Sequence, residues 1–180
     1  GWWQQIPSEY REDIRINNCP TIEIDYSGHH PVLLYAQAGV NYWSEIGGDV
    51  YDIPEADFFI RGEDEQRKAD SRLCLKYLVN MLINSETQED AMGAFRKRII
   101  DNHHEWVGFI RWRNEDLREF IIMLEKKHEP IAHQFGSGAG VKLQYIDSVI
   151  TSRLLKYFTE REVVVLPIHD SYVIQDRYGD

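Results

Sequence analysis

A chain of 180 residues, 43% hydrophobic and 28% charged, has the size and composition of a soluble globular protein: one core, or one core with a large insertion. Its apolar runs fall short of the roughly 20 residues of a membrane span, and its first residues lack the regions of a signal peptide, so no membrane partner is expected. The net charge of −10 counts against nucleic-acid binding by the surface as a whole and leaves only local basic clusters for that role.

Basic residues do gather in three places along the chain. The clusters contain Arg61, Arg67, Lys68, Arg72 and Lys76, then Arg96, Lys97 and Arg98, then Arg111 and Arg113. Taken alone, such clusters are more typical of solvated helix faces than of binding sites. The two cysteines, Cys19 and Cys74, lack a metal-binding spacing and favour a reducing cytoplasm.

In chain order, the first predicted element is a strand at 21–27, where apolar and polar side chains alternate. A short helix is predicted over 31–39. A longer helix is predicted over 70–84, with an apolar stripe on one side. A second row of this helix, at i, i+4 spacing, contains Arg72, Lys76, Asn80 and Asn84.

The middle of the chain predicts further helices. One covers 89–100, and another begins at Asn114 as N-cap and closes with Lys126, Lys127 and His128 before Pro130. Residues 136–140, which include three glycines, are expected to form a flexible connector. The long amphipathic helix that follows is predicted over 141–159.

The C-terminal part predicts a hairpin. A strand at 163–168 leads into a tight turn at His169-Asp170, and a returning strand follows at 171–175. The order of the elements predicts an α+β fold, in which an antiparallel sheet carries a helical insertion. We expect 1–55 and 141–180 to form the sheet-containing part, and 56–140 to form the insertion.

Two aspartates at predicted strand ends suggest a site for phosphoryl transfer. Asp25 lies near the end of the first strand and Asp170 lies in the hairpin turn, so pairing of the two strands would bring them together. Such chemistry uses two metal ions held by carboxylates, together with cations that grip phosphate. Arg72 and Lys76, one helical turn apart, have the required charge and spacing. Taken alone, a strand-end aspartate is more often a turn former than a metal ligand, and Arg72 and Lys76 could be surface charges of an ordinary helix.

Five short segments match a known pattern in the same order. They are Gln4-Gln5-Ile6-Pro7 with Ile14-Arg15; Asp25-Tyr26-Ser27 with Leu33-Leu34-Tyr35-Ala36 and Asp49-Val50-Tyr51; Arg72-x-x-x-Lys76; Leu143-Gln144; and Ile168-His169-Asp170-Ser171. Together they resemble the catalytic core of the A-family DNA polymerases, and of the related single-subunit phage-type RNA polymerases, over nearly the whole chain.

The resemblance implies a polymerase palm with an antiparallel sheet and a helical fingers insertion. It implies an enzyme that adds nucleotides to a primer 3′ end with two Mg²⁺ ions, for which Mn²⁺ can substitute. The implied metal ligands are Asp25, Tyr26 and Asp170. The implied nucleotide contacts are Arg72, Lys76, His30, Asn80 and Asn84, and the implied primer–template contacts are Gln144, His169, Gln4 and Gln5. Its partners would be a primer–template and nucleoside triphosphates, in a cytoplasmic, bacterial or phage-encoded setting.

Several positions depart from the family pattern. His30 stands where the DNA polymerases have a sugar-selecting glutamate, and Asn84-Ser85 stands where they have Tyr-Gly. Ser171 follows Asp170, as in the phage-type RNA polymerases, so the choice between deoxyribose and ribose stays open. The thumb and exonuclease that precede the palm in the family have no counterpart here, and further N-terminal domains are therefore expected.

Two alternatives remain beside a DNA polymerase or an RNA polymerase-like or primase-like enzyme with relaxed sugar choice. One is a catalytically inactive relative that binds nucleic acid, which the altered residues at 84–85 favour. The other is an unrelated metal-dependent phosphodiesterase that uses Asp25 and Asp170. Zinc binding by His103, His104, His128 and His133 is disfavoured, because no four-ligand spacing accompanies them.

Overall fold

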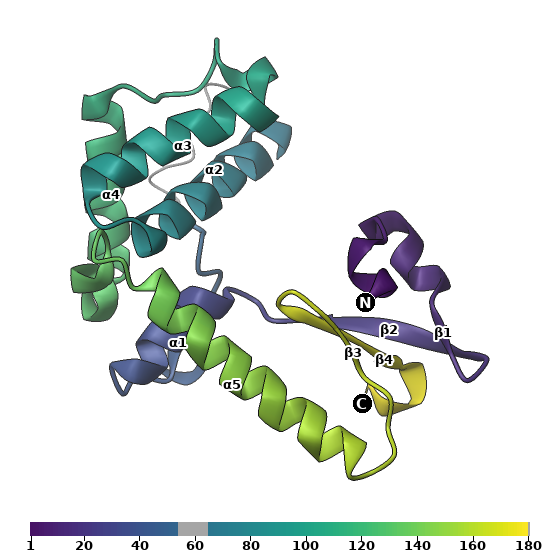
Figure 1. The fold of residues 1–180 in the computed structure, drawn as a ribbon. Helices are drawn as coiled ribbons and strands as arrows, with labels where there is room; N and C mark the ends of the chain where they lie inside the picture. Colours follow the sequence, from purple (N-terminus) through teal and green to yellow (C-terminus); the bar gives the residue numbers. More distant parts are fainter. Residues whose placement is uncertain (54–64, 180) are drawn as a thin grey trace. The chain divides into compact units, whose positions relative to one another are not determined.

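The computed structural model describes residues 1–53 and 65–179, which form both helices and strands (Figure 1). The strands are β1 Arg15–Ile16, β2 Cys19–Asp25, β3 Leu166–Ile168 and β4 Ser171–Gln175. The longer helices are α1 His29–Gln37, α2 Glu65–Asn84, α3 Gln88–Asn102, α4 Asn114–Lys127 and α5 Gly140–Thr159. Short helices include η1 Trp2–Gln5, η2 Ser8–Asp13, η3 Tyr42–Ile46, η5 His104–Trp106, η6 Glu129–Gln134 and η7 Asp176–Tyr178. The mixed architecture with an antiparallel sheet confirms the predicted α+β class.

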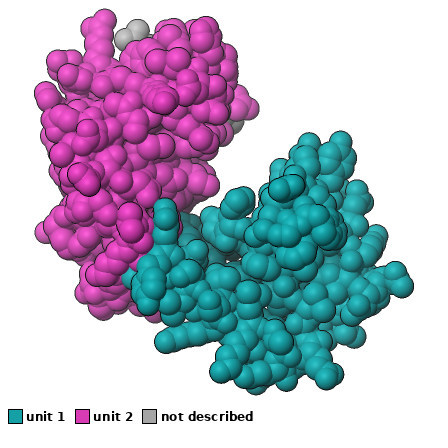
Figure 2. All heavy atoms as spheres, in the orientation of Figure 1, with its two compact units in different colours: residues 1–29, 144–180 teal, residues 30–143 magenta. Residues whose placement is uncertain are grey.

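The chain divides into two compact units (Figure 2). Unit 1 contains residues 1–29 and 144–180 and holds the sheet; unit 2 contains residues 30–143 and is helical. The helical unit therefore begins well before the predicted boundary at residue 56. The physical reason is that Leu34, Tyr35 and Val50 are buried in the helical core rather than against the sheet.

Unit 1 is built on the antiparallel pair of β2 and β4, within a sheet of order β1-β2-β4-β3 in the described residues. Thr21 pairs with Gln175 and Asp25 pairs with Ser171, so the predicted strand is present, although it covers Cys19–Asp25 rather than 21–27. The strand β3 is shorter than predicted. Its expected first residue, Val163, instead donates its N–H to the carbonyl of Phe158 in the turn that ends α5.

Different segments pack against the two faces of the sheet. On one face, Ile24, Tyr172 and Ile174 line a cavity together with Leu154 and Phe158 of α5. On the opposite face, a small apolar cluster contains Ile14, Ile168 and Val173, against which Trp3 and Ile6 of the N-terminal segment pack. All five residues of β4 are buried, whereas the residues of β2 are half-buried or exposed.

Unit 2 has a larger apolar core. The predicted stripe of α2 is confirmed, since Leu75, Leu78, Val79 and Leu82 are all buried. The side chains of α3 and α4 that complete the core include Phe95, Ile99, Phe120 and Leu124.

The start of α4 differs from the prediction in one respect. Arg113, not Asn114, is the N-cap, and the Asp116 carboxylate accepts its backbone N–H at 3.2 Å. Asn114 instead accepts a hydrogen bond from Arg96 of α3 through its side-chain oxygen. The prediction of Asn114 as N-cap was therefore wrong. The Asp116 carboxylate, three residues beyond Arg113, instead accepts the backbone N–H of Arg113.

The end of α4 also differs from the prediction. Lys126, Lys127 and His128 were expected to complement the helix dipole as cations, and His128 does not. His128 is fully buried, its Nε2 donates to the Val50 carbonyl, and its Nδ1 accepts from the Tyr35 hydroxyl. Burial, with a smaller contribution from the charge of Lys127, lowers the pKa of His128 to about 4. This imidazole is therefore neutral near pH 7 and cannot offset the dipole as a cation.

The buried histidine predicts a loss of stability in mild acid. The unfolded chain binds this proton with a pKa of about 6.5, whereas the folded chain binds it only near pH 4. The contribution of His128 is therefore complete above pH 6.5 and falls, by up to about 3 kcal/mol, as the pH decreases towards 4. A pH titration of its ring resonances by NMR should show a neutral imidazole at pH 5.5; titration near pH 6.5 would contradict the burial.

The glycine-containing connector is fixed to the end of α2 rather than flexible as expected. Gly136 donates its N–H to the Leu82 carbonyl at 2.7 Å, and Gly138 donates to the Ser85 carbonyl at 2.8 Å. Gly136 has a φ of 74°, and a Cβ atom there would lie 2.9 Å from the backbone nitrogen of Gln88. The turn therefore requires glycine and satisfies carbonyls at the helix end.

Candidate active site

The two predicted catalytic aspartates occupy neighbouring positions at one end of the sheet in unit 1. Asp25 is the last residue of β2 and pairs with Ser171, the first residue of β4. Asp170 precedes Ser171 in the turn, and its carbonyl accepts the N–H of Tyr26 at 3.5 Å. Both aspartates are exposed. The strand pairing thus brings together two residues that lie far apart in the sequence.

The turn that carries Asp170 has the predicted two-residue form. His169 is exposed and has a φ of 50°, in the left-handed region used by tight hairpin turns. Alternation along the paired strands places the side chains of Asp25 and Ser171 on the same face of the sheet. Asp170 lies outside the paired residues of β4, so strand alternation does not set the direction of its side chain.

A third carboxylate lies on the face of Asp25. The Ser171 hydroxyl donates to Glu23 at 2.5 Å, and Arg11 of η2 donates to the same carboxylate oxygen at 2.9 Å. We did not identify Glu23 as a site residue from the sequence, where it was only one polar position of an alternating strand. Its place two residues before Asp25 was the available signal, because residues i and i+2 of a strand share a face.

The donor set of the two aspartates suits a hard divalent cation. Mg²⁺ in proteins is usually held by one or two carboxylates, with water and substrate phosphates completing the octahedron. Exposed carboxylates at a strand end leave room for such additional ligands. Within residues 1–53 and 65–179, no group of three or more His, Cys, Asp or Glu side chains is arranged around a common metal position. A metal ion at Asp25 and Asp170 would therefore need oxygen ligands from outside the side chains, such as the carbonyl of Tyr26, water or phosphate.

A polar network joins the residues after β2 to α5. His29 Nε2 lies 2.8 Å from Asp147 Oδ1, and the rings of Tyr26 and His29 stack with centroids 4.7 Å apart. The hydroxyls of Tyr172 and Thr151 are 2.7 Å apart. Burial, then the neighbouring Tyr172 and the Asp147 charge, raise the pKa of Tyr26. The network thus includes Asp147 and Thr151 of α5, while Gln144, about one turn before Asp147, is exposed.

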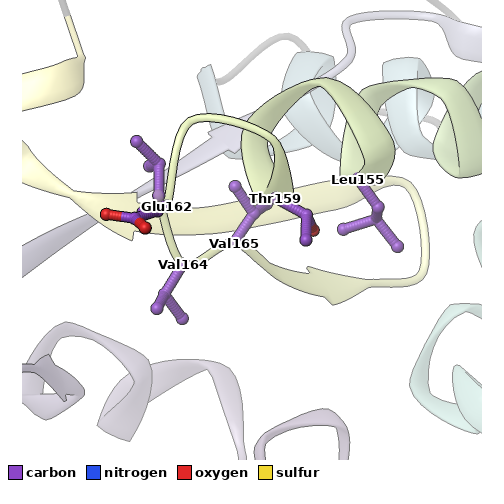
Figure 3. Close-up of a pocket in the computed structure, with 6 residues that line it drawn as sticks. Leu155, Thr159, Glu162, Val164 and Val165 are labelled. Carbon is purple, nitrogen blue, oxygen red and sulfur yellow. The ribbon is translucent and has the colours of Figure 1, made fainter.

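Two cavities flank α5 within unit 1. One of about 190 Å³ has a mostly apolar lining: Ile24, Tyr26, Leu154, Phe158, Val165, Tyr172, Ile174 and Tyr178. The other, of about 330 Å³, is drawn in Figure 3 and is lined by Leu155, Thr159, Glu162, Val163, Val164 and Val165. Neither lining includes Asp25 or Asp170, so the predicted catalytic pair lies outside both cavities.

The predicted triphosphate-binding cations belong to unit 2, on α2. The guanidinium of Arg72 lies 5.6 Å from the centroid of the Tyr51 ring, and the Lys76 ammonium lies 6.0 Å from the same centroid. Both cations thus project from one face of α2, as the i, i+4 spacing predicts. Arg72 Nε also donates to Asp49 Oδ2 at 2.5 Å, a contact that the sequence did not reveal.

The other predicted nucleotide contacts in unit 2 lie at helix ends. Asn84, the last residue of α2, is exposed, and its side-chain amide donates to the Asn80 carbonyl at 2.7 Å. His30 is half-buried in the first turn of α1. In unit 1, Gln4 and Gln5 are exposed in η1, and the Gln4 side chain accepts from the N-terminal amine. The residues predicted for the site therefore belong to both units.

No family model, curated protein or solved structure matches this chain. Among the described residues, no helix combines the length and hydropathy needed to cross a bilayer.

Proposed function

We propose that this chain is a template-dependent nucleotidyltransferase, similar to the A-family DNA polymerases. The observation that supports the proposal most strongly is the register of β2 and β4, in which Asp25 pairs with Ser171 and Asp170 follows the pairing by one position. The two segments that resemble the metal-binding motifs of that family are thus adjacent strand ends.

In this reaction the 3′ oxygen of a primer forms a bond to the α-phosphorus of a nucleoside triphosphate. The bond from that phosphorus to the bridging oxygen breaks, and pyrophosphate leaves with the electron pair. Asp25 and Asp170, assisted by the Tyr26 carbonyl, would hold Mg²⁺. The chemistry that the bound cations supply is activation of the primer hydroxyl and neutralisation of phosphate charge.

The remaining residues would bind and orient the substrates. Arg72 and Lys76 would donate hydrogen bonds to triphosphate oxygens and offset the charge that develops on the leaving pyrophosphate. His169, in the turn beside Asp170, would contact the primer end. Gln144 would contact the minor groove of the primer–template.

A primer-extension assay with dNTPs and rNTPs in parallel tests the proposal. We expect Mg²⁺-dependent extension with release of pyrophosphate and no degradation of either strand. Strand degradation without extension would indicate a phosphodiesterase instead. Absence of both activities, with Mg²⁺-dependent nucleotide binding that disappears in Asp25→Ala, would indicate an inactive relative that retains the site.

Sugar discrimination is expected to be weak. In the family that the chain resembles, a glutamate and an aromatic ring together exclude the ribose 2′-hydroxyl, and their places hold His30 and Asn84 here. A site without bulk or an unpaired polar group against that hydroxyl discriminates little. We expect the ratio of kcat/KM for dNTPs over rNTPs to stay below about a thousandfold, roughly 4 kcal/mol. A larger ratio would mean that His30 or another side chain acts as a gate.

A further inference from the structure

Within unit 2, residues at the end of α4 donate hydrogen bonds to the backbone of residues 49–52. Lys127 Nζ donates to the carbonyls of Asp49 and Asp52, at 2.8 and 2.5 Å. His128 donates to the carbonyl of Val50 between them at 3.0 Å. Three backbone oxygens of this short segment thus have donors on one helix end, which fixes where the Asp49 side chain projects.

Asp49 is held in an ionised form beside Arg72. Its Oδ1 accepts the N–H of Tyr51 at 2.8 Å, while its Oδ2 accepts from Arg72 Nε. Burial raises the pKa of Asp49, but the bonds from Arg72 and Tyr51 and the charges of Arg72 and Lys127 outweigh burial and lower the pKa overall. The carboxylate therefore stays negatively charged near neutral pH and accepts from the Nε of the Arg72 guanidinium.

Arg72 and Lys76 differ in their anionic neighbours, although both lie near the Tyr51 ring. The ion pair of Arg72 with Asp49 leaves the Arg72 side chain 47% exposed, so a ligand can still approach it from solvent. Lys76 is exposed, and no acidic partner is found for it among the described residues. An anion that contacts only Arg72 must compete with Asp49, whereas a longer anion can also contact Lys76.

We infer that Asp49 is a specificity-determining residue of an anion site formed by Arg72 and Lys76. It competes with single phosphate groups at Arg72 and is displaced by a polyphosphate chain that contacts both cations. That the natural ligand is a triphosphate rests on the proposed function. The competition itself follows from the Asp49–Arg72 ion pair and the spacing of the two cations.

The variant Asp49→Asn tests the competition with little change in shape. The side-chain oxygen that accepts from Tyr51 N–H is kept, while an amide NH₂, which cannot accept from Arg72, replaces the other oxygen. Asp52→Asn is the matched control. It removes the same charge from the same segment, its side chain is exposed, and it forms no described ion pair with Arg72.

Binding of inorganic phosphate and of inorganic tripolyphosphate would be measured by calorimetry, with thermal unfolding to confirm that each variant is folded. We expect Asp49→Asn to bind phosphate about three- to fivefold more tightly, the range of an exposed ion pair. The affinity for tripolyphosphate should increase less, so the ratio of tripolyphosphate affinity to phosphate affinity should decrease. Asp52→Asn should stay within about twofold of the unchanged chain, and adding Arg72→Ala to Asp49→Asn should remove the gain.

Equal affinities of the two asparagine variants, or weaker phosphate binding by Asp49→Asn, would overturn the inference. The measurement uses no metal, primer or template, so it is independent of whether the chain extends primers. Conversely, a chain that extends primers normally while Asp49→Asn has no effect on anion binding would refute only the role of Asp49.

Discussion

Asp25→Asn and Asp170→Asn are each expected to lower kcat for primer extension by about a thousandfold or more, roughly 4 kcal/mol of transition-state stabilisation. Each substitution removes a negative charge needed to hold a divalent cation, while it keeps the size of the side chain. Both aspartates are exposed at the end of a sheet. Neither substitution should therefore change the midpoint of thermal unfolding by more than a small amount.

Asp176→Asn provides the control for this pair. Asp170 immediately precedes β4 and Asp176 immediately follows it, and both are exposed aspartates of unit 1. The control removes the same charge from the opposite end of the same strand and should retain activity close to that of the unchanged chain. If Asp25→Asn or Asp170→Asn behaves like Asp176→Asn, the aspartate pair is not catalytic.

Lys76→Ala is expected to lower kcat/KM for the incoming nucleotide by about 30- to 1,000-fold, or about 2–4 kcal/mol. The ammonium group would stabilise the charge that accumulates on the leaving pyrophosphate. Lys76→Arg keeps the charge but alters the geometry and should recover part of the activity. Steady-state kinetics at varied nucleotide concentration would measure both variants.

Lys97→Ala is the matched control for Lys76, because Lys97 is an exposed lysine on the neighbouring helix α3 of the same unit. Its removal changes the net charge equally and should leave kcat/KM within about twofold. An unchanged kcat/KM in Lys76→Ala, or an equal loss in Lys97→Ala, would show that Lys76 acts only through general charge.

The local parts of the fold could be predicted from the sequence because they depend on neighbouring residues. The alternation before Asp25 predicts the faces of β2, and the apolar spacing around Leu78 predicts the buried side of α2. The two-residue turn at His169-Asp170 was also predicted. These features require only the periods of strands and helices and the chemistry of tight turns.

The contacts of the candidate site that were missed depend on residues far apart in the chain. The contact of Asp49 with Arg72 requires α4 to hold the segment that contains Asp49, and the contact of Glu23 with Ser171 requires the register of β2 and β4. The buried state of His128 likewise depends on Tyr35 and Val50 from other parts of unit 2. No local pattern encodes such pairs. Polymerase activity, its metal ions and its substrates stay predictions.

Template-directed addition of a single nucleotide tests the central claim most directly. One primer would be annealed to four templates that differ only in the first unpaired base, and each duplex would receive each nucleoside triphosphate separately with Mg²⁺. We predict that only the complementary nucleotide is added, with one pyrophosphate released per addition, and that Asp25→Asn abolishes the addition. Addition that ignores the templating base, or no addition by the unchanged chain under conditions in which it is folded and binds the duplex, would contradict the proposed function.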